Sequence, residues 1–170
     1  DNDGSRLERF LRSPMAASPG VSEIALGVVL SEGRLLVQLR PEGAPPGGTW
    51  EFPGGKRRAD ESLEEAVVRE VGEETGMVVE AGDLLVALSH RYPDRVVSLY
   101  AYLCRRIGET GTRSSIEWIT PAEYRARPIP AANPAILDAL EWELQRSCGD
   151  RGAPRANGQY DREPSSLDNL

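Results

Sequence analysis

Carboxylates crowd one short segment of this 170-residue chain, residues 54–77, with the sequence GGKRRADESLEEAVVREVGEETGM. Three of them, Glu70, Glu73 and Glu74, are spaced so that their side chains would project from one side of a helix. Clustered hard oxygen donors suit Mg²⁺ or Mn²⁺, which often bridge protein carboxylates to substrate phosphates. An acidic helix can also be a solvated surface, and spacing alone favours that structural interpretation over a metal site.

The segment carries signals for both ends of a helix. Ser62 followed by Glu65 forms a capping box, which predicts that the helix begins near Leu63. Gly76 suits the residue that ends a helix in the left-handed conformation. We therefore expect a helix from about residue 63 to the residue before Gly76.

The direction of the three carboxylates favours a site over a solvated surface. With Glu70 at zero and about 100° per residue, Glu74 lies at about 40° and Glu73 at about −60°. Three apolar residues project to the same side: Leu63, Ala66 and Val67. Because this is the side that the helix should bury, we expect partly buried carboxylates that raise one another's pKa, a cost that a divalent cation offsets.

The composition excludes several classes of protein. The net charge of −7 and the isoelectric point near 4.9 argue against binding to a nucleic-acid polymer. No apolar run is long enough to span a membrane, and the first 20 residues lack the apolar core of a signal peptide. The two cysteines have no metal-type spacing, and we expect free thiols in a cytoplasmic, monomeric protein that binds a small ligand.

The remaining pattern indicates one α/β domain, residues 21–147, between a flexible arm at 1–20 and a disordered tail at 148–170. Asn133, followed by Pro134, suits the N-cap of the last helix. The order of elements favours a sandwich of helices around a mixed β-sheet. We expect strands at 22–30, 34–40, 49–53, 83–92, 95–104 and 116–119, and further helices at 121–127 and 133–147.

The acidic segment resembles the Nudix box, Gly-x5-Glu-x7-Arg-Glu-U-x-Glu-Glu-x-Gly-U, where U is a bulky apolar residue. All its defined positions are filled: Gly55, Glu61, Arg69, Glu70, Val71, Glu73, Glu74, Gly76 and Met77. The stretches WEFPGGK, RYPDRVVSLYAYLC and PIPAANPAI resemble the MutT branch of this family, and the resemblance covers about residues 21–145. It implies an α/β/α sandwich and hydrolysis of a nucleoside triphosphate to the monophosphate and pyrophosphate.

Within that branch the resemblance leaves the substrate open. One type removes 8-oxo-dGTP from the nucleotide pool, and a sister group prefers CTP, dCTP and modified pyrimidine nucleotides. A hydrolase of a linked nucleoside diphosphate such as ADP-ribose is a third reading, against which WEFPGGK and PAAN weigh. A nucleotide-binding regulatory domain with weakened catalysis is a further alternative.

The resemblance also implies roles for residues of the box. Glu70, Glu73 and Glu74 would bind Mg²⁺, or Mn²⁺, with help from the carbonyl of Gly54. The catalytic residues would be Glu70, Glu73 and Arg69. Since an arginine cannot act as a base, we expect Arg69 to hold a neighbouring glutamate in place.

Substrate binding maps by resemblance to a larger set: Arg40, Glu51, Phe52, Pro53, Gly54, Lys56, Tyr92, Arg95 and Asn133. Lys56 would meet phosphate or is a solvated loop lysine, and Phe52 and Tyr92 would stack on a base or belong to the core. The amide of Asn133 could donate to O6 and accept from N7–H of an oxidised guanine, whereas normal guanine presents two acceptors there. Its structural alternative is a helix cap.

One position departs from the MutT pattern. These proteins commonly carry a glutamate six residues before the tryptophan of the EW strand, and here that position is Thr112. Glu109 and Glu117 lie nearby but not at the expected place. Glu109 would substitute for the missing group, or Glu70 would carry the role of base, or activity would be low.

Overall fold

The computed structural model describes residues 20–40, 48–91, 95–111, 113 and 115–149. Within them, a seven-stranded sheet has the order β3-β2-β1-β6-β5, with β4 beside β1 and β7 beside β2. Strand β1 runs parallel to β6 and antiparallel to β2 and β4, so the prediction of a mixed sheet is confirmed. The strands are β1 (Gly20–Ser31), β2 (Arg34–Leu39), β3 (Trp50–Glu51), β4 (Gly54–Lys56), β5 (Met77–Arg91), β6 (Arg95–Glu109) and β7 (Ile116–Ile119).

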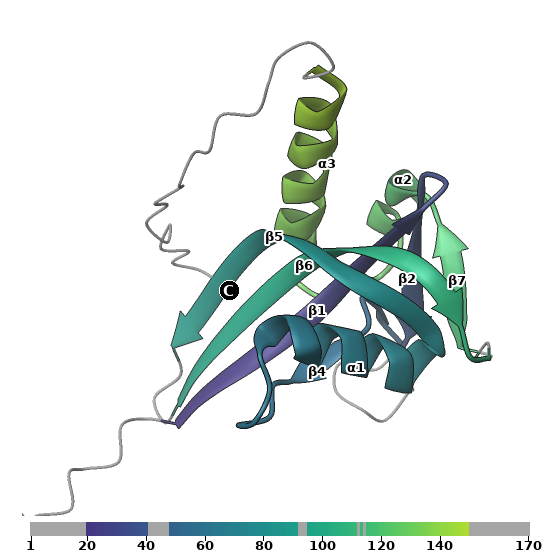
Figure 1. Cartoon of the computed structure of the whole chain (residues 1–170). Helices are drawn as coiled ribbons and strands as arrows, with labels where there is room; N and C mark the ends of the chain where they lie inside the picture. Colours follow the sequence, from purple (N-terminus) through teal and green to yellow (C-terminus); the bar gives the residue numbers. More distant parts are fainter. Residues whose placement is uncertain (1–19, 41–47, 92–94, 112, 114, 150–170) are drawn as a thin grey trace, which may run out of the picture.

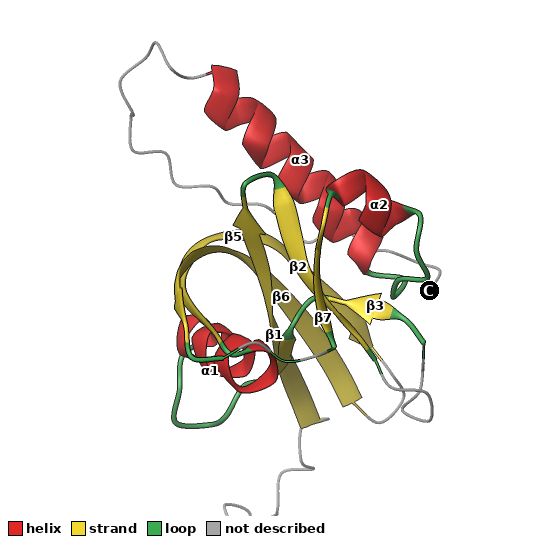
Figure 2. Cartoon of the chain, turned by 90° about the vertical axis from the view of Figure 1, so that its right-hand side faces the viewer, coloured by secondary structure: helices red, strands yellow, loops and turns green. Residues whose placement is uncertain are grey.

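Helices cover both faces of this sheet (Figures 1 and 2). Helix α1 (Leu63–Thr75) lies on one face, and α2 (Pro121–Arg125) and α3 (Asn133–Gly149) lie on the other. The α/β/α sandwich predicted from the sequence is therefore the observed fold class.

Two hydrophobic clusters, one on each face, hold the three layers together. Val67 and Val71 of α1 pack in the first cluster, and Ile136 and Leu140 of α3 pack in the second. Strand β2 contributes to both, because successive side chains of a strand point to opposite faces. Leu36 thus joins the α1 cluster, while Leu35 and Val37 join the α3 cluster.

Helix α1 has the ends that its sequence indicates. The Ser62 hydroxyl accepts a hydrogen bond from the backbone N–H of Glu65, and the Glu65 carboxylate accepts from the Ser62 N–H, which completes the capping box. Gly76 ends the helix with a φ of 75°, in the left-handed region that favours glycine. The carboxylates of this helix are therefore fixed in register by both ends.

The chain departs from the predicted elements in three strands: β4 was not predicted, β6 ends at Glu109 rather than at residue 104, and β5 has an additional first half. This strand begins at Met77 rather than at residue 83, directly after the glycine that ends α1. Its pairing with β6 shifts register between Ala81 and Leu84 and again before Val86. These bulges interrupt the alternation of apolar and polar residues, which is why the sequence pattern conceals the first half of the strand.

The boundaries of the domain stay predictions, because residues 1–19 and 150–170 lie outside the described part. Strand β1 already includes Gly20, and α3 continues to Gly149, past the predicted boundary at 147. Among the described helices none has the length and apolar character needed to cross a membrane. Cys104 is an unpaired, buried thiol, and burial raises its pKa to about 12.

Replacing Gly76 by alanine should destabilise the fold. A Cβ there would lie 1.7 Å from the carbonyl oxygen of Gly111, and the backbone φ of 75° disfavours any residue with a side chain. We expect Gly76→Ala to lower the free energy of unfolding by more than about 1 kcal/mol in urea titrations.

Gly72→Ala is the matched control for this substitution. A Cβ at Gly72 first meets the Met77 carbonyl oxygen at 3.8 Å, an ordinary contact. Alanine also favours a helix over glycine by about 1 kcal/mol, so this variant should be as stable as the wild type or more stable. Equal stability of the two variants would contradict the proposed strain at Gly76.

Candidate active site

A cavity of about 690 Å³, here the central cavity, opens between the C-terminal half of α1, the start of α3 and strands β1 to β4. Its wall includes apolar side chains of β1 and β6, among them Leu26 and Leu99. Many of the residues predicted from the sequence line it: Arg40, Glu51, Phe52, Gly54, Glu73, Glu74 and Asn133. The fold thus brings acidic residues of α1 into one space with Asn133 of α3.

One guanidinium organises the acidic side of this region. Arg69 donates through Nε and Nη2 to both carboxylate oxygens of Glu61, at 2.8 and 2.5 Å. Its Nη1 donates to Glu70 at 2.6 Å and to Glu73 at 3.2 Å, and Nη2 also reaches the Lys56 carbonyl oxygen at 3.3 Å. The hydrogen bonds from Arg69 lower the pKa of Glu61 to about 2, so this carboxylate stays ionised and is only a weak base at neutral pH.

Glu74 lies in a different environment from its neighbours. One of its oxygens, Oε2, accepts from the backbone N–H of Gly54 at 2.9 Å and from Nε2 of Gln38 at 2.7 Å. Burial raises the pKa of Glu74 above its usual value, and the charges of Glu70 and Glu51 add to this effect while the two hydrogen bonds oppose it. The site therefore holds an excess of negative charge that a cation would offset.

The three carboxylates differ in exposure. The Glu70 side chain is 15% exposed, whereas that of Glu73 is 52% exposed. The expectation that all three are partly buried is therefore wrong for Glu73. The residues that α1 buries are Ala66, Val67, Val71 and Thr75. With Glu70 at zero, Glu73 lies at about −60° around the helix, just outside the edge of this buried face.

Two glycines let the chain pass between β1 and α1. A Cβ on Gly54 would lie 2.3 Å from the Ala25 carbonyl oxygen, and a Cβ on Gly55 would lie 2.6 Å from the carboxylate of Glu70. Both contacts are shorter than van der Waals distance. Glycine at these positions brings the β4 backbone directly against the Glu70 carboxylate.

The donor set of α1 fits a divalent cation. Glu70, Glu73 and Glu74 offer hard carboxylate oxygens beside the Gly54–Gly55 backbone, and the charges of Glu70 and Glu51 add to the burial that raises the pKa of Glu74. Across the described residues, no three acidic, histidine or cysteine side chains are grouped closely enough to ligate an ion as they stand. The contacts with Arg69 and Gln38 occupy these oxygens, so metal binding would exchange some of them.

Phe52 and Asn133 also line the central cavity, and both contact Tyr124. Phe52 is 2% exposed, and its ring packs 4.9 Å from that of Tyr124, centroid to centroid. Asn133, a residue that is also 2% exposed, donates through its amide to the Tyr124 hydroxyl at 2.5 Å, and that hydroxyl donates to the Trp50 carbonyl at 2.9 Å. Asn133 is the first residue of α3 rather than the residue before it, and its side-chain amide contacts Tyr124.

The other predicted substrate residues lie in several places. Arg40 pairs with Glu51 at 3.2 Å at the edge of the central cavity. Pro53 is buried and its carbonyl accepts from Gly27 at 2.8 Å, while Lys56 and Arg95 are exposed. Of the described residues that line the central cavity, none is Pro53, Lys56 or Arg95. Tyr92 lies outside the described residues.

The loop before β7 contributes residues that the sequence analysis missed. Thr112 is outside the described part, but its neighbour Arg113 and Ser115 line the central cavity. Glu109 instead bonds Arg106 at 2.7 Å. Gln38 was also missed, although a single amide within the apolar run of β2 is a signal that could have marked it.

Glu117, the second glutamate near this loop, bonds Arg127 at 2.7 Å. Neither Glu117 nor Glu109 is among the described residues that line the central cavity. The carboxylates of Glu109 and Glu117 are thus held in ion pairs with Arg106 and Arg127 and do not reach the central cavity.

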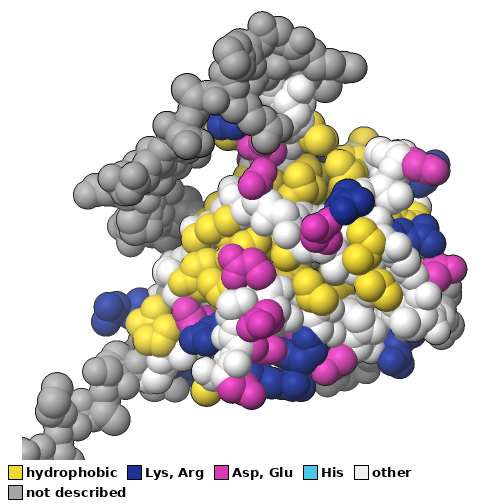
Figure 3. Space-filling view, in the orientation of Figure 1, with side chains coloured by type: hydrophobic (Ala, Val, Ile, Leu, Met, Phe, Trp, Pro, Cys, Tyr) yellow, Lys and Arg dark blue, Asp and Glu magenta, His cyan; other side chains and the backbone are white. Residues whose placement is uncertain are grey.

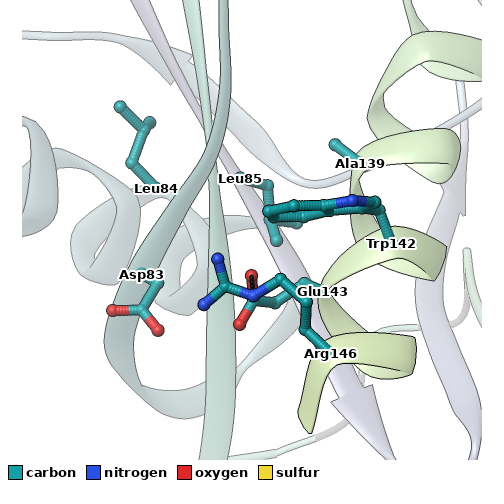
Figure 4. A pocket seen from close by; sticks show the side chains of 7 residues that line it. All are labelled: Asp83, Leu84, Leu85, Ala139, Trp142, Glu143 and Arg146. Atoms are coloured by element: carbon teal, nitrogen blue, oxygen red, sulfur yellow. Dashed lines mark ion pairs between the residues drawn. The ribbon is translucent and has the colours of Figure 1, made fainter. Parts of the chain in front are cut away.

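A second hollow, of about 440 Å³, lies between β5 and α3 (Figure 4). Trp142 faces Leu85 there, and the Arg146 guanidinium lies 4.6 Å from the indole ring. None of the described residues that line this hollow was predicted as a site residue. Figure 3 shows acidic and basic side chains next to one another on the lower part of this face of the molecule.

Known proteins share this sequence pattern and fold. The chain is 32% identical over 124 residues to an 8-oxo-dGTP diphosphatase of Haemophilus influenzae, covering 71% of this chain and 91% of the relative. It is 28% identical over 121 residues to a CTP pyrophosphohydrolase of Escherichia coli, covering 69% and 90%. The crystal structure of a MutT NUDIX hydrolase from Burkholderia pseudomallei superposes with a TM-score of 0.61 at 26% identity, covering 71% of this chain and 98% of that one.

The family model of the NUDIX domain matches residues 25–139, which span the sheet, α1 and the start of α3. This match includes the Gly54–Gly55 turn, the carboxylates of α1 and Asn133. The chain therefore belongs to the Nudix family and is a Nudix hydrolase.

Proposed function

We propose that this protein is an Mg²⁺-dependent nucleoside triphosphate pyrophosphohydrolase that removes 8-oxo-dGTP or a related oxidised nucleotide from the nucleotide pool. Water and the triphosphate would yield the monophosphate and pyrophosphate. The observation that carries the proposal is the central cavity, which joins the acidic end of α1 to the buried amide of Asn133. A relative at 32% identity is named an 8-oxo-dGTP diphosphatase, which supports the same substrate.

The acidic end of the cavity suits the phosphates only together with a cation. A triphosphate is itself strongly anionic and would be repelled by Glu51, Glu73 and Glu74. A bound divalent cation, Mg²⁺ or Mn²⁺, would offset this charge and lower the pKa of an attacking water. Arg40 and Arg113 line the same cavity and can pair with phosphate oxygens.

Within this proposal the residues of α1 have separate tasks. Glu70, Glu73 and Glu74 would hold the cation beside the Gly54 backbone. Arg69 keeps Glu70 and Glu73 oriented through its hydrogen bonds and remains protonated at any relevant pH. Glu70 is the candidate for the base because its carboxylate lies against the Gly54–Gly55 backbone that would help to hold the cation, whereas the low pKa of Glu61 makes that carboxylate a weak base.

The amide end of the cavity suits a base edge with a donor next to an acceptor. Oxidation of guanine at C8 places a proton on N7 beside the O6 acceptor, which Asn133 can match with its oxygen and one N–H. Phe52 borders the same space and offers an aromatic surface. Normal guanine would leave the amide oxygen without a donor, which disfavours it.

A CTP or dCTP pyrophosphohydrolase is the second candidate, favoured by the 28% identity to a relative of that name. The regulatory alternative with weakened catalysis rests on Thr112 at the position of the expected glutamate. Turnover of a nucleotide panel with Mg²⁺, scored for pyrophosphate against phosphate release, separates these three readings. Absence of turnover with retained nucleotide binding would favour the regulatory reading.

Activity should require a divalent cation, and Glu70→Gln should remove most of it. This change keeps the shape of the side chain but removes a ligand charge beside Gly55, so kcat should fall about a hundredfold or more. Mg²⁺ should also raise the melting temperature of the wild type, because it binds only the folded chain. The increase should be smaller in Glu70→Gln.

Glu64→Gln is the matched control, since Glu64 is an exposed glutamate in the first turn of the same helix. It should leave both turnover and the metal-induced rise in melting temperature unchanged. Near-normal turnover of Glu70→Gln, or activity that persists after chelation with EDTA, would show that the metal assignment is wrong.

Asn133→Ala should erase most of the preference for 8-oxo-dGTP over dGTP. The lost hydrogen bond is worth about 1–3 kcal/mol, which corresponds to roughly 5- to 150-fold in kcat/KM. Turnover at saturating dGTP should change less, because Asn133 belongs to α3 and not to the carboxylates of α1 that would hold the cation. If the wild type has equal kcat/KM for 8-oxo-dGTP and dGTP, the oxidised-guanine substrate is wrong and the CTP-type substrates are favoured.

A further inference from the structure

We propose that Tyr124 is a positioning residue that fixes the orientation of the Asn133 amide and thereby sets which base edge the central cavity accepts. This inference rests on the proposed function and assigns a role to a residue that sequence reasoning missed. Tyr124 is fully buried, lies on α2 and reaches the strand β3 through its hydroxyl.

The direction of the hydrogen bonds follows from the groups involved. The Trp50 carbonyl can only accept, and it lies 2.9 Å from the Tyr124 oxygen. A phenol hydroxyl has one proton, so the Tyr124 hydroxyl donates that proton to the Trp50 carbonyl. Burial raises the pKa of Tyr124, which keeps that proton in place. Toward Asn133, 2.5 Å away, the hydroxyl can therefore only accept.

The amide of Asn133 must accordingly turn its NH₂ group toward Tyr124. Its carbonyl oxygen, Oδ1, then points away from the hydroxyl and accepts no hydrogen bond from any described residue. No fully buried side-chain oxygen or nitrogen in the described part lacks a partner. Since Asn133 is 98% buried yet lines the central cavity, Oδ1 is open toward that cavity.

This arrangement presents one acceptor and the second amide N–H to a ligand. It matches a base edge that carries an N–H beside a carbonyl, as 8-oxoguanine does, and opposes the two neighbouring acceptors of guanine. Without the Tyr124 hydroxyl, the amide can rotate by about 180° and offer its NH₂ group to guanine. An amide has nearly the same shape in two orientations related by a rotation of about 180°. The Tyr124 hydroxyl thus holds the Asn133 amide in the one orientation that matches the oxidised base.

The first test observes the amide directly and needs no nucleotide. The side-chain ¹H–¹⁵N signals of Asn133 are identified by their loss in Asn133→Ala. In the wild type, one amide proton should be shifted downfield and should exchange slowly with water, because it is bonded to the Tyr124 oxygen. Tyr124→Phe should remove both properties. Signals unchanged by Tyr124→Phe would overturn the positioning role.

The second test measures the consequence for selectivity. Fixing a side chain in one orientation is worth about 0.5–1.5 kcal/mol, so Tyr124→Phe should lower the ratio of kcat/KM for 8-oxo-dGTP over dGTP about two- to tenfold. The change should appear in KM, with kcat for each nucleotide close to the wild-type value. Calorimetric titration with the products 8-oxo-dGMP and dGMP should show the same loss of selectivity without turnover.

Ile119→Val is the control for a loss of core packing. Ile119 lies in the same hydrophobic cluster as Tyr124 but makes no side-chain hydrogen bond, so its truncation should destabilise the fold without changing the ratio. An equal fall of the ratio in Ile119→Val and Tyr124→Phe would reduce Tyr124 to a structural role.

The two proposals fail separately. A wild type that prefers 8-oxo-dGTP and a Tyr124→Phe variant with the same preference would overturn this inference and leave the proposed function standing. A wild type without preference would overturn the proposed substrate and the selectivity argued from it, and the amide spectra would then decide the positioning role alone.

Discussion

The contact between Arg69 and three carboxylates is the interaction on which the acidic side of the protein depends. Without the positive charge of Arg69 among them, Glu61, Glu70 and Glu73 would repel one another. Arg69 bonds all three and also the Lys56 carbonyl, so it joins α1 to the segment that leads out of β4. The glycine backbone can then lie directly against Glu70, which no side chain at residue 55 would allow.

The second half of the site depends on the packing of the other layer. Tyr124 and Phe52 belong to the hydrophobic cluster beneath α2 and α3, and that cluster holds Asn133 at the wall of the central cavity. The amide is thereby shielded from bulk water but remains accessible from the central cavity. Each of its hydrogen bonds is therefore stronger than the same bond would be in water. The carboxylates of α1 and the amide of Asn133 are thus supported by different cores.

Local signals made much of this structure predictable from sequence. The capping box of Ser62 and the left-handed Gly76 define α1 without reference to the rest of the chain, and the carboxylates follow from its register. Gln38 and Arg113 were missed because their place in the cavity depends on pairing between β2 and β7, which is non-local. The first half of β5 was missed because bulges break its alternation, and the role of Tyr124 depends on a bond to a strand far away in sequence.

The layered arrangement has a consequence for how such proteins diverge. The sheet separates the α1 cluster from the α3 cluster, and the central cavity takes its acidic wall from one side and its amide and aromatic wall from the other. Under the proposed function, substitutions in the α3 layer would alter ligand choice while the carboxylates of α1 keep their support. Mutations in one layer would then be tolerated without matching changes in the other layer. Related proteins of this fold could therefore keep the same reaction and differ in the substrate that they accept.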